Sequence, residues 1–88
     1  MTFTPEQLRQ FAEAGGWQYQ AYVSTDLPDF PNDLKACFEV LERVCKDYDL
    51  RLRNGVVFVC TIYKPSDEWA ETGTTKQEAI IKAVLQCR

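Results

Sequence analysis

The stretch that decides the fold runs from Leu27 to Glu42 and reads LPDFPNDLKACFEVLE. Prolines and the aspartates Asp26, Asp29 and Asp33 precede an apolar periodic segment. These acids lack the alternating spacing of calcium ligands and the glycine of a calcium loop. Proline keeps the preceding residue extended, and an aspartate at the start of a helix caps it and complements its dipole. We therefore interpret the acidic cluster as the start signal of a helix and not as a metal or catalytic site.

An amphipathic helix is predicted directly after these aspartates. Apolar residues recur at i, i+3, i+4 and i+7, the spacing of one buried helix face. They are Leu34, Cys37, Phe38, Leu41, Val44, Cys45 and Tyr48. Charged residues take the opposite face, so the pattern predicts a helix that extends to Tyr48 and packs on the core.

A β-hairpin is predicted in the next segment, DLRLRNGVVFVCTIYK. The pair Asn54-Gly55 is typical of a type I′ turn, in which both central residues need a positive φ. A two-residue turn pairs Arg53 with Val56 and places Arg51 and Arg53 beside Phe58 on one face. The second strand is apolar on both faces, which predicts a central strand that is covered on both sides.

The chain before residue 27 predicts one further helix. Thr4 is a candidate N-cap, Gln7 completes a capping box with it, and Gly15 and Gly16 end the helix. Residues 17–23 alternate between apolar and polar side chains. That pattern fits a half-buried strand, and it equally fits an extended loop whose aromatic rings pack on the core.

The C-terminal part predicts a strand and a closing helix. Residues 68–72 fit a third strand, and Thr75 with Glu78 forms a capping box before an apolar helical stripe. The elements together predict an α+β fold with a small antiparallel sheet, made of the hairpin plus a third strand, sandwiched between helices. We expect one α/β/α sandwich domain over residues 1–88.

Composition sets limits on the location of the protein. The chain has 88 residues, four cysteines and a net charge of −3. The N-terminal MTFTPEQ lacks the basic and apolar regions of a signal peptide, and the longest apolar run is too short for a membrane span. We therefore expect a cytoplasmic protein. Cys37 and Cys45 lie too far apart along one helix to bridge each other, so we expect reduced, mostly buried thiols.

The sequence contains few of the residue patterns that catalysis requires. There is no histidine, which removes the common Ser–His and Cys–His arrangements and weakens any zinc site. No glycine-rich phosphate loop precedes a helix. We expect neither an enzyme nor a cofactor or metal, and the acidic net charge argues against binding of nucleic acid by the chain as a whole.

Four residues form a candidate binding site on the predicted hairpin. Arg51, Arg53, Phe58 and Lys64 would make a basic and aromatic strip that stacks on a base or receives an acidic partner. The alternative is structural. In that interpretation the arginine stems cover apolar sheet and their guanidinium groups pair with carboxylates of a neighbouring helix.

The chain resembles the phage ABA sandwich domain family over roughly residues 17–88. The resemblance lies in LPDFPNDLKACFEVLERV, in the hairpin and in AETGTTKQEAIIKAVL, with Phe38 where tryptophan is expected. It implies a small α/β/α sandwich of phage, prophage or mobile-element origin and carries no established activity. Residues 70–83 are also similar to the end of HicB-like antitoxins and to double-stranded RNA-binding domains. The RNA-binding pattern fails at the helix start, which offers Lys76 and then Glu78.

These observations predict a small non-enzymatic protein of phage or mobile-element type that acts by protein–protein binding. A homodimer is expected, because two copies would cover an open sheet edge or the arginine face. The alternative is a nucleic-acid-binding or antitoxin-like module that uses the basic strip of Arg51, Arg53 and Lys64. No membrane association is expected.

Overall fold

The computed structural model describes residues 3–16 and 28–87. In order along the chain, these residues form α1 (Pro5–Ala14), a 3-10 turn η3 (Phe30–Asn32), α2 (Leu34–Val44), β1 (Asp47–Arg53), β2 (Val57–Lys64), β3 (Asp67–Gly73) and α3 (Lys76–Cys87). Residues 17–23, for which a strand or an extended loop is predicted, lie outside the described residues.

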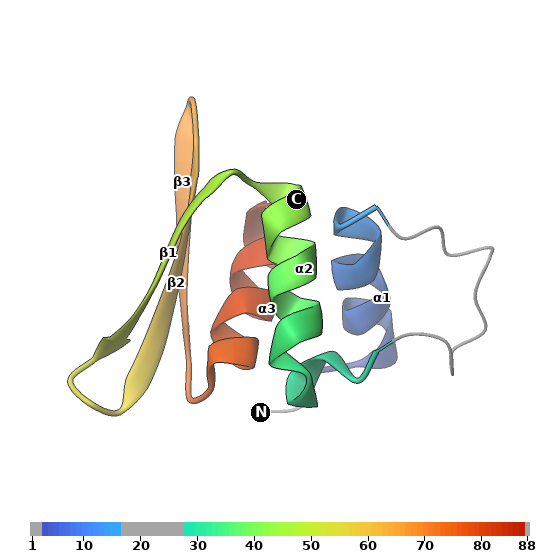
Figure 1. The fold of residues 1–88 in the computed structure, drawn as a ribbon, viewed down its shortest axis with the longest axis horizontal. Coiled ribbons are helices and arrows are strands. Elements are labelled where there is room, and N and C mark those ends of the chain that lie inside the picture. Colours follow the sequence, from blue (N-terminus) through green and yellow to red (C-terminus); the bar gives the residue numbers. More distant parts are fainter. Residues whose placement is uncertain (1–2, 17–27, 88) are drawn as a thin grey trace.

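The sheet is antiparallel throughout, with the strand order β1-β2-β3. The α+β class with this sheet packed against helices is confirmed. The described helices lie together on one face of the sheet, which stands at the left edge of Figure 1, rather than on both faces. The predicted third strand at residues 68–72 is present as β3.

Helix α3 forms the centre of the core. It contacts β2 and β3 on one side and α1, α2 and η3 on its other sides. A helix that is enclosed in this way must be apolar around most of its circumference. The buried residues of α3 meet that demand; they are Ala79, Ile80, Ile81, Ala83, Val84 and Cys87. The apolar sheet face and the two outer helices therefore share one contact partner.

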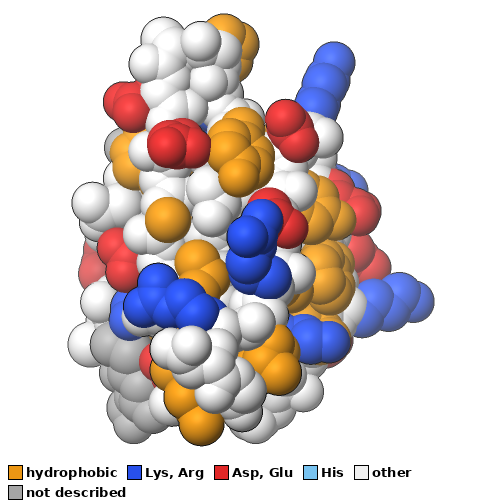
Figure 2. Space-filling view, turned by 90° about the vertical axis from the view of Figure 1, so that its left-hand side faces the viewer, with side chains coloured by type: hydrophobic (Ala, Val, Ile, Leu, Met, Phe, Trp, Pro, Cys, Tyr) orange, Lys and Arg blue, Asp and Glu red, His pale blue; other side chains and the backbone are white. Residues whose placement is uncertain are grey.

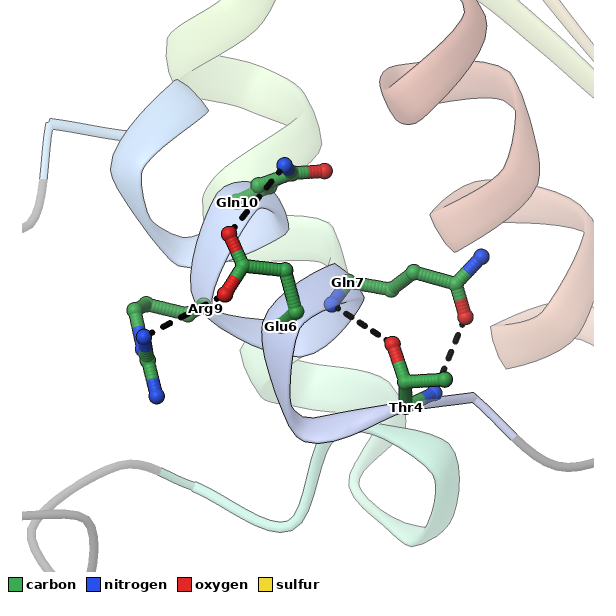
Figure 3. A network of polar contacts seen from close by, with 5 residues as sticks. All are labelled: Thr4, Glu6, Gln7, Arg9 and Gln10. Carbon is green, nitrogen blue, oxygen red and sulfur yellow. Dashed lines mark hydrogen bonds and ion pairs between the residues drawn. The ribbon is translucent and has the colours of Figure 1, made fainter.

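The predicted start of α1 is confirmed by its hydrogen bonds (Figure 3). The Gln7 N–H donates to Thr4 Oγ1 at 3.1 Å, and the Thr4 N–H donates to Gln7 Oε1 at 2.9 Å. The helix ends at Ala14, and Gly15 follows as its C-cap. A Cβ at Gly15 would lie 3.0 Å from Val40 Cγ1, so this glycine allows α1 to approach α2 closely.

The acidic stretch is confirmed as the start signal of a helix. Asp33 is the N-cap of α2, and its side chain accepts from the Ala36 N–H at 3.1 Å. Asp29 accepts from the Asn32 side-chain amide at 2.9 Å. Asp26 lies outside the described residues. Between the aspartates the chain buries Phe30 completely.

Phe30 anchors the turn to the core. Its ring meets the Phe11 ring edge-on, with centroids 4.9 Å apart and an interplanar angle of 83°. Its carbonyl oxygen accepts a hydrogen bond from the Cys37 thiol, with a sulfur–oxygen distance of 3.1 Å. An edge-to-face ring pair is favourable because the positive ring edge meets the negative face. The turn thus ties the first helix to the second.

The prediction that the second helix extends to Tyr48 is wrong. The helix ends at Val44, Cys45 is extended with φ −147° and ψ 156°, and Tyr48 lies in β1 opposite Ile62. The apolar spacing predicted a helix that is too long, because Tyr48 continues the helical spacing although it lies in a strand on the same side of the molecule. Its ring centroid lies 6.3 Å from that of Phe38.

The predicted turn is present, but the predicted register is wrong by one residue. Asn54 and Gly55 have φ of 56° and 71°, and the Val56 N–H donates to the Arg53 carbonyl at 3.2 Å. The ladder nevertheless pairs Arg53 with Val57, which leaves Val56 as an additional exposed residue of the connection.

The shift has a physical reason. Because side chains alternate between the faces of a strand, a slip of one residue moves the whole set to the other face. The observed register places Leu50 beside the fully buried Cys60, on the face that meets the helices. With the helices on one face only, this register places the apolar side chains of β1 there together with Phe58, Cys60 and Ile62 of β2, and it turns Arg51 and Arg53 outward.

Candidate functional site

The face of the sheet that points away from the helices is the candidate binding surface, and we call it the open face. The strand pairing assigns to it these residues: Asp47, Asp49, Arg51 and Arg53 of β1, Val57, Val59, Thr61 and Tyr63 of β2, and Glu68, Ala70 and Thr72 of β3. Figure 2 shows this side of the molecule, where hydrophobic side chains lie among charges of both signs. No described helix packs on it.

The pairing arranges these residues in rows across the strands. The first row is Asp47, Tyr63 and Glu68, and the second is Asp49, Thr61 and Ala70. The third row is Arg51, Val59 and Thr72, and the fourth pairs Arg53 with Val57. One end of the open face is therefore acidic and the other end is basic.

The central strand of the open face, β2, carries apolar side chains that are partly accessible. Val57 and Val59 are half-buried, and Tyr63 is 37% exposed. A hollow of about 480 Å³ lies here, lined by Arg51, Arg53, Val59, Thr61, Tyr63, Glu68 and Ala70. Accessible apolar side chains bordered by charges match the layout of a protein interface, whose buried core is more apolar than its rim.

The Arg51 guanidinium is paired within the open face. Its Nε donates to Asp49 Oδ2 at 2.7 Å, and its Nη2 contacts the same oxygen. The Arg51 side chain is 69% exposed, and such surface ion pairs contribute little to stability. The pair is therefore free to exchange partners when another charged surface approaches.

The four predicted binding residues do not lie together. Arg51 and Arg53 are on the open face, whereas Phe58 and Lys64 are on the face that carries the helices. The Phe58 ring lies 5.8 Å from Lys76 Nζ, and Lys64 Nζ lies 5.7 Å from the Trp69 ring. The grouping of Arg51 and Arg53 with Phe58 was wrong because it rested on the shifted register. Whether the arginines bind a partner stays a prediction.

Other residues of the open face were not among the four predicted binding residues. Val59, Tyr63 and Glu68 share the hollow with the arginines, but the predicted register put the valine on the opposite side of the sheet. The signal that would have found them is the alternation of Cys60 and Ile62 with Val59 and Thr61 in β2. Only the cysteine and isoleucine are fully buried.

The four cysteines are buried, as predicted. Burial raises the pKa of the Cys37 and Cys60 thiols to about 12, and the charge of Asp33 adds to the effect at Cys37. Burial also raises the pKa of Cys45 and Cys87. A thiol must ionise to act as a nucleophile. These groups therefore remain protonated at neutral pH and behave as small apolar side chains.

A second hollow, of about 630 Å³, lies where α2 runs into β1. Its lining mixes acidic, basic and apolar side chains; the residues are Glu42, Arg43, Val44, Cys45, Lys46, Asp47, Tyr63, Lys64 and Pro65. Within residues 3–16 and 28–87, no group of three or more His, Cys, Asp or Glu side chains is placed to hold a metal ion. None of the helices in this part of the chain is long and apolar enough to cross a bilayer.

Comparison with known proteins adds no relative. No protein-family model matches the chain, and no curated protein or solved structure is significantly similar to it.

Proposed function

We propose that the protein acts by binding another protein through the open face of its sheet, without catalysis. The observation that supports this is the accessible apolar centre formed by Val57, Val59 and Tyr63, with arginines at one end and acids at the other. Aromatic residues and arginine are enriched in protein interfaces. A sheet face without a described cover is a ready platform for such contacts.

A protein partner fits this face better than nucleic acid does. The open face carries Asp47, Asp49 and Glu68 against Arg51 and Arg53. Phosphate backbones bind to clustered positive charge, and each acid on the face repels them. Lys64, the third member of the predicted basic strip, lies on the other side of the sheet.

The cellular setting of this proposal is the cytoplasm, in a phage or mobile-element context. The resemblance to the phage ABA sandwich domain family supports the context, and four protonated, buried thiols fit a reducing compartment. Nothing in this setting requires a cofactor.

The test is capture of protein partners by the immobilised protein, from host lysate and from a solution of the purified chain. We expect Tyr63→Glu to abolish capture, because it adds a charge to the apolar centre of the open face at an already exposed position. Gln86→Glu adds the same charge on an exposed position of α3 and serves as the matched control, with capture retained. Equal capture by both variants would contradict the proposal.

Nucleic-acid binding is measured separately by titration with DNA and RNA at low salt. Binding that weakens steeply with salt and is lost in Arg53→Ala would replace the proposal with the nucleic-acid alternative.

A further inference from the structure

The charges of the open face are sorted along the strands. Asp47 and Glu68 lie in the first row, Asp49 lies in the second, and Arg51 and Arg53 lie in the third and fourth. The acidic end and the basic end are thus separated by the midline of the sheet. A surface sorted in this way is complementary to itself when one copy is reversed along the strand direction.

Two symmetric arrangements bring two such faces together, and the charges distinguish them. A twofold axis parallel to the strands sets β1 over β3 of the other copy and puts Asp47 against Glu68, acid on acid. A twofold axis that lies between the sheets and crosses the strands sets β1 over β1 in the opposite direction. Each acidic row then meets a basic row, as a symmetric interface requires, with residue i on j and j on i. Like charges placed opposite each other suppress the first arrangement.

We propose that the partner of the open face is a second copy of this chain, packed face to face about an axis that crosses the strands. This proposal rests on the proposed function and names its partner. Arg53 of each copy lies opposite Asp47 of the other, and Arg51 lies opposite Asp49. The ion pair between Arg51 and Asp49 within one copy then exchanges for pairs between copies.

The same axis stacks the apolar middle of the sheets. Tyr63 of β2 lies over Val57 of the other copy, and Thr61 lies over Val59, because these pairs are equally distant from the midline. Packed sheets lie about 10 Å apart, a gap that these side chains fill from both sides. The arrangement buries the Tyr63 ring in place of its present exposure of 37%.

The small size of the face limits the strength of the dimer. From the strand spacing and rise, three strands of this length cover roughly 14 by 23 Å. That is below the area of a standard stable interface, so we expect a dissociation constant in the micromolar range and a clear weakening at high salt.

The test is sedimentation equilibrium of the full chain from micromolar to millimolar concentrations. We expect a reversible dimer that Arg53→Asp weakens about tenfold or more, and that Asp47→Arg weakens to a similar degree. The double variant R53D/D47R should restore the wild-type affinity to within about threefold, because the charges are exchanged across the axis. Both positions are exposed, so folding is not at risk, and circular dichroism checks it.

Three outcomes would overturn the inference. One is a monomer at every concentration, and another is a dimer that is insensitive to R53D. The third is a dimer that D47R strengthens, because that result indicates an axis parallel to the strands, with Asp47 near Glu68. None of these outcomes decides the proposed function. If the chain is a monomer but its open face still captures a host protein, the proposed function holds and the second copy is rejected as the partner. If the chain neither dimerises nor captures a host protein, both proposals are rejected.

Discussion

Gly73 is the residue at which a single methyl group should do most harm. It ends β3, pairs with Phe58 of β2, and is buried against the first turn of α3. A Cβ at this position would lie 2.6 Å from the Ala79 backbone nitrogen and 2.8 and 2.9 Å from Glu78 Cβ and Cγ. Real Cβ contacts almost never fall below 3.0 Å and ordinary ones begin at 3.4 Å, so the helix start must move by about 0.4 Å to be tolerated and by about 0.8 Å to make an ordinary contact.

The substitution Gly73→Ala should therefore lower the free energy of unfolding substantially. Overpacking of a tight site costs about 1–3 kcal/mol, and the upper part of that range applies because the closest atom is backbone in a central helix. The gain from a stiffer unfolded chain offsets less than about 1 kcal/mol. We expect a net loss of about 2 kcal/mol, which lowers Tm by about 8–16 °C in a domain of this size.

Urea and thermal unfolding followed by circular dichroism measure this loss. Gly55→Ala is the matched control, because Gly55 has φ +71° and no atom within 4 Å of the added methyl group. It tests backbone strain without a clash and should cost about 1 kcal/mol. If Gly73→Ala is no more destabilising than Gly55→Ala, the close approach of β3 to α3 is not a constraint on the fold.

Three further predictions concern the opening stretch and the thiols. Phe30→Ala removes a fully buried ring and should lower the free energy of unfolding by about 3–5 kcal/mol. The far-ultraviolet circular dichroism spectrum at 37 °C should then lose its helical signal, and a fully folded variant would contradict this. Asp33→Ala removes the cap of α2 and should cost about 1 kcal/mol in urea unfolding, whereas Asp29→Ala should cost less than half of that. The contribution of Cys37 and Cys60 to stability should be constant below about pH 9 and fall between pH 9 and 12. Burial raises the pKa of both thiols from 9.0 to about 12, so only the unfolded thiols ionise in that window. The slope is at most about 1.4 kcal/mol per pH unit for each thiol, and Cys60→Ala should reduce it in urea titrations at several pH values.

Features set by neighbouring residues were predictable from the sequence. Thr4 and Asp33 cap their helices through backbone groups three residues away, so the pattern of caps carries all the needed information. The turn at Asn54 and Gly55 was predictable for the same reason, because positive φ is a local property.

Features set by distant residues were not predictable in this way. The register of β1 on β2 depends on which sheet face the helices cover, and no short stretch reveals that. The end of α2 was missed because Tyr48 continues the apolar period from a strand. The error in the predicted register also made part of the predicted binding site wrong. Arg51 and Arg53 were rightly placed together on one face, but their neighbours on β2 were predicted wrongly.

The enclosed position of α3 has a consequence for how the chain folds during synthesis. The ribosome makes this helix after every other described element, yet β2, β3, α1 and α2 all pack on it. Until Ile80, Ile81 and Val84 have emerged, the sheet lacks the helix that packs on β2 and β3. The core is therefore completed only after α3 has been made, and until then the apolar surfaces that α3 covers are open to aggregation.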